Sequence, residues 1–182
     1  DTLVNIQNVI GTKNSDLIKM GTVAGALESV ANTIDGGDGI DTISYEYYTS
    51  NLTINLGSGS VATGDNDLLT SIENAIGGSA KDKFIMTEDK ETNVIDGQGD
   101  SDTVSYINYT SNGVRVNLST TASQIVSILD TDTIKNIENV IGSQKDDIFI
   151  GSSEANSIEG SSGNDTFIAG TDITNDGSIE SV

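Results

Sequence analysis

Short apolar stretches alternate with turns rich in Gly and Asp along most of the chain. The pattern is clearest in three consecutive nonamers, GSQKDDIFI (142–150), GSSEANSIE (151–159) and GSSGNDTFI (160–168), each with Gly first and Asp or Asn sixth. We interpret each nonamer as a six-residue turn, where Gly allows a positive φ, followed by a short strand with an inward apolar side chain. Alternation in ISYEYY (43–48) and GVRVNL (113–118) predicts further strands between the nonamers.

A larger repeat contains these nonamers. The segments DTLVNIQNVIG (1–11), DLLTSIENAIG (67–77) and DTIKNIENVIG (132–142) align without gaps, and their starting positions are almost evenly spaced. Repeats that cannot bury an apolar face alone stack on their neighbours, so we expect one continuous solenoid. We divide it into repeat unit 1 (1–66), repeat unit 2 (67–131), a partial repeat unit 3 (132–170) and a polar tail (171–182).

Two nonamers predict one coil of the solenoid, which places Asp147 and Asp165 on top of each other at the strand spacing of about 4.8 Å. Two carboxylates so close repel by roughly 1 kcal/mol even in water, so we expect a cation between them. The first two units have longer intervals between matching glycines, from Gly11 to Gly36 and from Gly77 to Gly97. We expect an insertion around 23–29 to bulge outward while the coil still closes.

The amino-acid composition limits the kinds of functional site that the chain can form. The chain has 8 Lys+Arg against 28 Asp+Glu, a net charge of −20, and no His, Cys, Pro or Trp. Imidazole and thiolate metal sites, His-activated nucleophiles and disulfides are therefore excluded, while hard cations suit the carboxylates and carbonyls that remain. Arg115 is the single Arg, so we expect no nucleic-acid partner. The apolar runs are too short for direct membrane insertion.

The same inventory argues against catalysis in this chain. Carboxylate pairs are abundant, but His, a Trp platform for sugars and a cluster of basic side chains are all missing. We therefore expect that the chain is not an enzyme, and we leave open a catalytic domain elsewhere in a parent protein. Since the sequence starts at Asp1, in the middle of a recurring pattern, we also expect it to be a fragment of a longer protein.

Two segments resemble a known family. GGDGIDTIS (36–44) fits the nonapeptide G-G-x-G-x-D-x-U-x in full, and residues 137–170 are similar throughout to linked arrays of such nonapeptides. The chain thus resembles the RTX (repeats-in-toxin) family of secreted toxins, S-layer proteins and large adhesins. The resemblance implies an all-β fold, a right-handed parallel β-roll or β-solenoid, with Ca²⁺ ions between stacked turns.

The resemblance also implies which residues bind Ca²⁺. The sixth-position carboxylates would be those of Asp41, Asp102 and Asp165 and, one coil earlier, Asp16, Asp82 and Asp147. The Gly-rich positions would be Gly36, Gly37, Gly39, Gly97, Gly99, Gly142, Gly160 and Gly163. Asp100 and Ser161 stand where the motif has Gly, and the degenerate turns before Asp67 and Asp132 are weaker candidates for the same role. We rank the third array first and the stacked partner of the first array last.

Two further sets of residues recur with the repeat. We expect inward amides that satisfy stacked turn backbones, with ligand or glycan contact as the alternative, at Asn8, Asn74 and Asn139. We expect rings that stack on each other between repeats, with sugar binding as the alternative, at Tyr45, Tyr47, Tyr48, Tyr106 and Tyr109. A Thr-rich ice-binding face is disfavoured because no regular T-x-T ladder is present.

These observations together predict a secreted, extracellular or cell-surface protein that stays unfolded where calcium is scarce and folds on Ca²⁺ binding after export. The family resemblance implies type I secretion from a Gram-negative bacterium. For the parent we favour an S-layer or adhesin role, with self-association or neighbouring repeats as partners. The alternative is a folding and export module of a secreted toxin or extracellular enzyme.

Overall fold

The computed structural model describes residues 8–21, 32–56, 60–62, 67–88, 92–127 and 130–169, which contain eighteen strands and no helix. In chain order the strands are β1 (Asn8–Ile10), β2 (Leu17–Lys19), β3 (Thr33–Asp35), β4 (Thr42–Ser44), β5 (Thr53–Asn55), β6 (Ser60–Ala62), β7 (Asp67–Thr70), β8 (Asn74–Ile76), β9 (Lys83–Ile85), β10 (Val94–Asp96), β11 (Thr103–Ser105), β12 (Arg115–Asn117), β13 (Gln124–Ser127), β14 (Asp130–Lys135), β15 (Asn139–Ile141), β16 (Ile148–Ile150), β17 (Ser157–Glu159) and β18 (Thr166–Ile168). The polar tail (171–182) lies outside the described residues.

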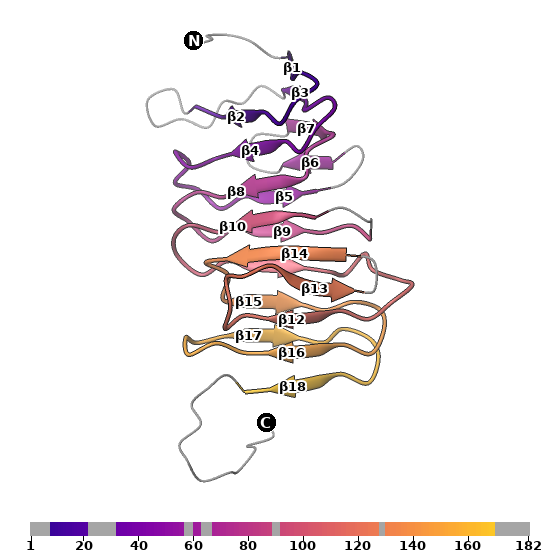
Figure 1. Cartoon of the computed structure of the whole chain (residues 1–182). Helices are drawn as coiled ribbons and strands as arrows, with labels where there is room; N and C mark the ends of the chain where they lie inside the picture. The colour runs from indigo at the N-terminus through magenta and orange to yellow at the C-terminus, as the bar shows by residue number, and fades with distance from the viewer. Residues whose placement is uncertain are drawn as a thin grey trace.

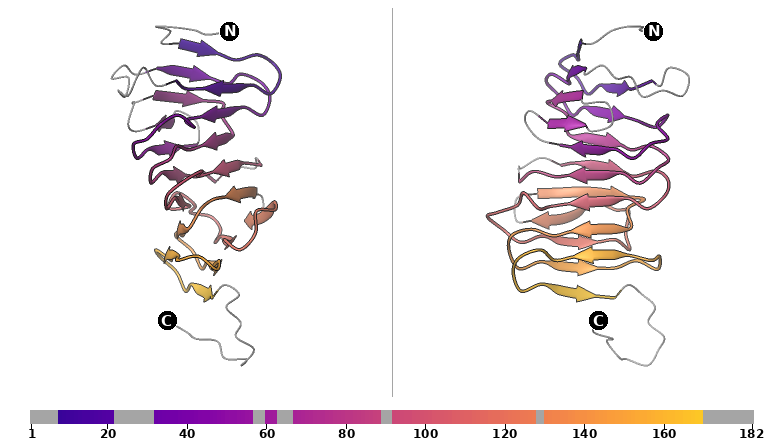
Figure 2. Two further views of the ribbon diagram at one scale, coloured as in Figure 1. Left: turned by 90° about the vertical axis from the view of Figure 1, so that its left-hand side faces the viewer. Right: turned by 180° about the vertical axis from the view of Figure 1, so that it is seen from behind.

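The strands stack along one axis that runs from the N-terminal to the C-terminal end of the molecule (Figure 1). They form four ladders, ordered β1-β3-β7-β6, β13-β14-β10-β8-β4-β2, β17-β15-β11-β9-β5 and β12-β16-β18. All pairings are parallel except β6 with β7 and β13 with β14. Figure 2 shows the same stack from one side and from behind. The expected all-β parallel solenoid is confirmed; its right hand and the division into units stay predictions.

The strand register confirms the coil lengths that the sequence predicts. In the third unit, β16 pairs with β18 so that Ile148 faces Thr166, the residue at the same place two nonamers later. In the first unit Leu17 faces Thr42, and in the second Lys83 faces Thr103, as the longer intervals between their glycines require. The longer first coil therefore closes, although the insertion around 23–29 lies outside the described residues.

The interior is a narrow stack of single side chains. A three-residue strand points only its middle residue inward, since successive side chains alternate between the two faces. Fully buried middle residues are Ile34, Ile43, Ile54, Ala75, Phe84, Ile95, Val104 and Val116. The low aromatic content therefore suits this core, because each coil has room for only one large side chain per strand.

The tyrosines correct one expectation. Tyr45 packs edge-to-face on Tyr48 with ring centroids 5.2 Å apart, and Tyr106 packs in the same way on Tyr109 at 5.1 Å. Each pair therefore stacks within one repeat, and the expected stacking between repeats is wrong. Tyr47 is 56% exposed and belongs to neither pair.

Buried carboxylates explain where these rings lie. The Tyr45 hydroxyl donates to Asp67 Oδ2 at 3.2 Å, the Tyr106 hydroxyl donates to Asp132 Oδ2 at 3.0 Å, and the Tyr109 hydroxyl donates to Asp130. Burial, followed by the Asp132 charge, raises the pKa of Tyr106 well above its usual value, so the hydroxyl keeps its proton. Because protein donors already satisfy Asp67 and Asp132, we do not extend the cation sites to these two residues.

Replacing a buried core ring should unfold the chain much more easily than replacing an end ring. Phe84 is fully buried, and Phe84→Ala is expected to lower the free energy of unfolding by about 3–5 kcal/mol because it leaves a cavity. Phe167 is 42% exposed on the last strand, so Phe167→Ala is the matched control with a smaller expected loss. Urea unfolding in saturating Ca²⁺ measures both, and equal losses would contradict this description of the core.

Candidate metal centres

Three pairs of Gly- and Asp-rich turns lie directly on top of each other. We call them the first stack (11–16 and 36–41), the second stack (77–82 and 97–102) and the third stack (142–147 and 160–165). Each turn connects strands of facing ladders, and each stack follows the parallel pairing of the strands beside it. The first and third stacks lie on the right-hand edge of Figure 1 and the second stack lies on the left-hand edge.

Sixth-position carboxylates link the two turns of every stack. The backbone N–H of Asp16 donates to Asp41 Oδ1 at 2.7 Å, and that of Asp82 donates to Asp102 Oδ1 at 2.7 Å. The third stack repeats this contact, at 3.0 Å, from the N–H of Asp147 to Asp165 Oδ1. The predicted stacking of all six Asp residues is confirmed.

The first Gly of each earlier turn is needed because oxygen atoms crowd around it. A Cβ on Gly77 would lie 2.5 Å from Asp82 Oδ2 and 2.9 Å from the Gly97 carbonyl oxygen. A Cβ on Gly142 would lie 2.3 Å from Asp147 Oδ2 and 2.6 Å from the Gly160 carbonyl oxygen, and a Cβ on Gly11 would lie 2.0 Å from the Gly36 carbonyl oxygen. Each stack thus brings a carboxylate oxygen and a carbonyl oxygen to the same place, a hard-cation donor set. Gly11 and Gly77 were not among the predicted site residues.

Other motif positions need a left-handed backbone. Gly37, Gly39 and Gly163 have positive φ and lie against the backbone of the turn one coil earlier. The departures from the motif adopt the same conformation, with φ of 72° at Gln98, 70° at Asp100 and 70° at Ser161. Gly99 is packed more loosely, since its nearest neighbour would be 3.7 Å from an added Cβ. The substituted turns therefore keep the nonapeptide shape at a cost in backbone strain.

Two buried carboxylate oxygens lack a hydrogen-bond donor. Asp41 and Asp102 are fully buried, and the Oδ2 atom of each has no hydrogen-bond partner among the described residues. A buried ionised carboxylate is costly unless it is paired or binds a cation. Within the described ranges the one ion pair is Lys19 with Glu46 at 2.8 Å, away from both oxygens. The oxygen donors of each stack and these two unpartnered carboxylate oxygens fit a bound Ca²⁺ ion.

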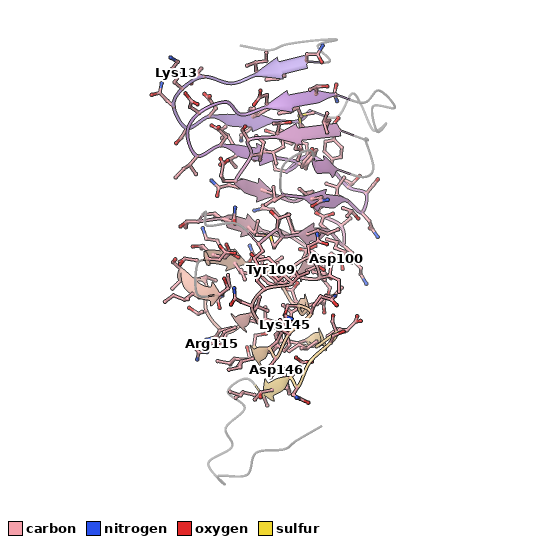
Figure 3. All side chains as sticks on the ribbon, turned by 90° about the vertical axis from the view of Figure 1, so that its right-hand side faces the viewer. Lys13, Asp100, Tyr109, Arg115, Lys145 and Asp146 are labelled. Atoms are coloured by element: carbon pink, nitrogen blue, oxygen red, sulfur yellow. The ribbon has the colours of Figure 1, made fainter. Side chains whose placement is uncertain are left out.

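Basic side chains of the stacks point to solvent. Lys13 and Lys145 belong to the turns of the first and third stacks, yet both are exposed, as is Arg115 on β12. Figure 3 shows Lys13 and Arg115 at the margin of the ribbon. In the part of the chain that the structure describes, no three acidic side chains form a group able to hold a metal ion. A cation in a stack would therefore depend on carbonyl oxygens as well as one or two carboxylates.

The second stack should respond to pH in the absence of calcium. Burial, with the nearby charges of Asp82 and Glu138, raises the pKa of Asp102 to about 7. A raised carboxyl pKa favours the protonated fold, so this contribution to stability is present below about pH 4 and is lost as the pH rises through about 7. In EDTA, acidification from pH 8 to pH 5 is expected to increase the β signal in circular dichroism. Asp102→Asn, which cannot ionise, should show a flatter profile, whereas a wild-type signal that falls on acidification would contradict the expectation.

Two functional candidates were missed by the sequence reasoning. The N–H of Asp41 donates to Glu73 Oε2 at 2.7 Å, and the N–H of Asp102 donates to Glu138 Oε2 at 2.9 Å. Both glutamates belong to the I-E-N sequence that recurs in the large repeat, at 72–74 and 137–139. The recurrence of this Glu is visible in the sequence. The spacing of the nonamers, however, does not predict that the Glu contacts a nonapeptide turn.

Two of the three recurring amides behave as expected, whereas Asn8 on β1 is exposed and does not point inward. Asn74 accepts the N–H of Val94 at 2.7 Å, and Asn139 donates to the Asp102 carbonyl oxygen at 3.0 Å, so both satisfy backbone groups of a neighbouring coil.

The described residues contain no helix that is long and apolar enough to cross a membrane.

Comparison with protein families agrees with the geometry of the turns. The model of the RTX calcium-binding nonapeptide repeat matches residues 30–44 and 141–173, with four copies. These segments contain the later turn of the first stack and both turns of the third stack. The second stack lies outside them, yet it has the same hydrogen bonds and the same crowded Gly. A search of curated proteins finds no match.

Proposed function

Because the chain carries RTX nonapeptide repeats, which bind Ca²⁺, we propose that it is the calcium-binding repeat region of a secreted bacterial surface protein and that it folds on Ca²⁺ binding after export. The observation that carries the proposal is that each stack of Gly-rich turns brings a carboxylate oxygen and a carbonyl oxygen to one place beside its first Gly. RTX repeats occur in secreted proteins, and the repeat is a structural calcium-binding module with no catalytic role.

In each stack, the ion would be held between the two turns. The carboxylate of the earlier Asp and the carbonyl oxygen of the later first Gly face the same space, for example Asp82 and Gly97. We propose as the full ligand set Asp16, Asp41, Asp82, Asp102, Asp147 and Asp165 with Gly36, Gly37, Gly39, Gly97, Gly99, Gly142, Gly160 and Gly163. Burial favours the first two stacks over the third, which the sequence ranks first, since Asp165 is exposed on the last described coil.

The net negative charge of the chain couples Ca²⁺ binding to folding. At a net charge of −20, compaction brings carboxylates together, which opposes folding. An ion that binds the fold and not the unfolded chain stabilises the fold by mass action. Weak sites of about 10⁻⁴ to 10⁻³ M would stay empty at intracellular calcium and fill outside the cell.

Isothermal titration calorimetry tests the binding directly. An EDTA-treated and desalted sample should bind several Ca²⁺ ions per chain with millimolar or tighter affinity, and Mg²⁺ should not displace them at equal concentration, since it demands a stricter octahedral geometry. Absence of Ca²⁺ binding, or equal binding of Mg²⁺, would overturn the proposal.

For the parent protein we propose an S-layer or adhesin role with self-association. The support is that both ends of the described solenoid expose apolar strand residues, Ile10 and Leu17 at one end and Phe167 and Ile168 at the other. Such ends suit stacking on further repeats. Analytical ultracentrifugation should show calcium-dependent assembly. A folded monomer at all concentrations would instead favour the folding and export module of a secreted toxin or extracellular enzyme.

A further inference from the structure

The first and second stacks each continue into a third turn that is not a nonapeptide. We call these turns the first arc (Ser71–Glu73) and the second arc (Asn136–Glu138). The first arc lies one coil after turn 36–41, because β3 pairs with β7 and β4 pairs with β8 on either side of it. The second arc lies in the same way after turn 97–102, between the pairs β10–β14 and β11–β15.

The arcs reproduce the crowding found inside the stacks. A Cβ on Gly36 would lie 2.0 Å from the Ser71 carbonyl oxygen and 2.5 Å from Asp41 Oδ2. A Cβ on Gly97 would lie 2.2 Å from the Asn136 carbonyl oxygen and 2.3 Å from Asp102 Oδ2. A carbonyl oxygen of each arc therefore takes the place that the first Gly of a later nonapeptide turn occupies within a stack.

The arc carbonyls come from a left-handed backbone. Ser71 has φ 52° and Asn136 has φ 50°, a conformation that non-Gly residues adopt at a cost. The same strained conformation occurs at the same position of the second and third copies of the large repeat.

The carboxylates that face the arcs differ from those inside the stacks. Asp82 Oδ2 accepts the N–H of Gly78 at 2.6 Å, and Asp147 Oδ2 accepts the N–H of Ser143 at 2.7 Å. Asp16 Oδ2 likewise accepts the N–H of Thr12 at 2.6 Å. The Oδ2 atoms of Asp41 and Asp102, which face the arcs, are buried and accept no hydrogen bond from the described residues. The unpartnered carboxylate oxygens that a cation would neutralise therefore lie between a nonapeptide turn and an arc.

Each arc also brings one carboxylate of its own. Glu73 Oε2 accepts the N–H of Asp41, and Glu138 Oε2 accepts the N–H of Asp102, as the later Asp does within a stack. Together with Asp41 or Asp102 and the arc carbonyl, each glutamate completes a set of oxygen donors from two coils, the type of site that Ca²⁺ prefers.

We propose that Glu73 and Glu138 complete two further calcium sites, each formed between a nonapeptide turn and an arc of the large repeat. The ligands are the Asp41 carboxylate, the Ser71 carbonyl and Glu73 at the first arc, and the Asp102 carboxylate, the Asn136 carbonyl and Glu138 at the second. This inference rests on the proposed calcium binding and goes beyond it, because these sites need one nonapeptide turn instead of two.

The variants Glu73→Gln and Glu138→Gln test the inference. Gln keeps an oxygen that accepts the N–H of Asp41 or Asp102 but removes the charge, and the large repeat has Gln7 at this position in its first copy. By calorimetry with Ca²⁺ alone, each variant is expected to bind one ion fewer than wild type or to bind that ion about tenfold more weakly. The double variant should lose two ions. Glu159→Gln, at an exposed position of β17, is the matched control and should bind as wild type does.

The outcomes separate the two proposals. Wild-type protein that binds no Ca²⁺ overturns the proposed function and this inference together. Wild-type protein that binds Ca²⁺, with both Gln variants unchanged in ion number and affinity, overturns this inference alone. If a variant does not reach the wild-type circular dichroism spectrum in saturating Ca²⁺, anomalous diffraction from wild-type crystals grown in calcium decides, since density is expected beside both arcs and its absence there contradicts the sites.

Discussion

Chelation of calcium at pH 8 is expected to convert the chain from β-structure to coil. Within the described residues most strands are three residues long, so few backbone hydrogen bonds hold each coil. The turns bury Asp41, Asp82, Asp102 and Asp147, and no basic side chain pairs with any of these four among the described residues. We therefore expect that, without a cation, the cost of burying these charges exceeds what a narrow aliphatic core of single side chains supplies.

Far-UV circular dichroism with and without EDTA measures this conversion. Restoring Ca²⁺ to millimolar levels should return the β signal, while Mg²⁺ at the same concentration should not. If the β spectrum is unchanged in EDTA, the aliphatic core is sufficient for folding and the proposed switch is wrong.

Adding one methyl group beside the carboxylates should weaken both folding and calcium binding. In Gly97→Ala the new Cβ would lie 2.2 Å from the Asn136 carbonyl oxygen and 2.3 Å from Asp102 Oδ2, both inside contact distance. Because the first of these neighbours is backbone, the turn itself must move. We expect a loss of about 1–3 kcal/mol in the free energy of unfolding at saturating Ca²⁺, with weaker binding at the second arc.

The matched control is Gly21→Ala. Gly21 has no atom within 4 Å of an added Cβ, so this change should leave both unfolding and calcium binding near wild type. Chemical denaturation and calorimetry measure the two quantities. Wild-type behaviour of Gly97→Ala would contradict the packing of oxygen atoms around this position.

The sequence was sufficient to predict the coil and most of the turns. The interval of two nonamers between Asp147 and Asp165 predicts their stacking directly, because two equal nonamers leave no choice of register. The longer interval between Asp16 and Asp41 also closes, because β2 still pairs in parallel with β4 and the Asp16 N–H still reaches Asp41.

Contacts between unlike segments were not predictable in the same way. Glu73 reaches Asp41 from a segment that shares no motif with the nonapeptides, and only the strand pairing of three successive coils brings the two together. The tyrosine pairs were placed between repeats because the rings recur with the repeat. Each ring instead packs on the second Tyr of its own repeat, and the Tyr106 hydroxyl donates to the buried Asp132 at the start of the next unit. Self-comparison of a sequence shows which residues recur, but it does not show which of them meet.

We propose that Ca²⁺ ions between stacked turns hold the coils together. Anomalous diffraction from crystals of the calcium-loaded chain tests it most directly. We expect anomalous density between the turns of the first and second stacks, within ligand distance of Asp16 and Asp82, at about 2.3–2.6 Å from the coordinating oxygens. A folded chain in millimolar Ca²⁺ with no anomalous density in any stack would contradict it.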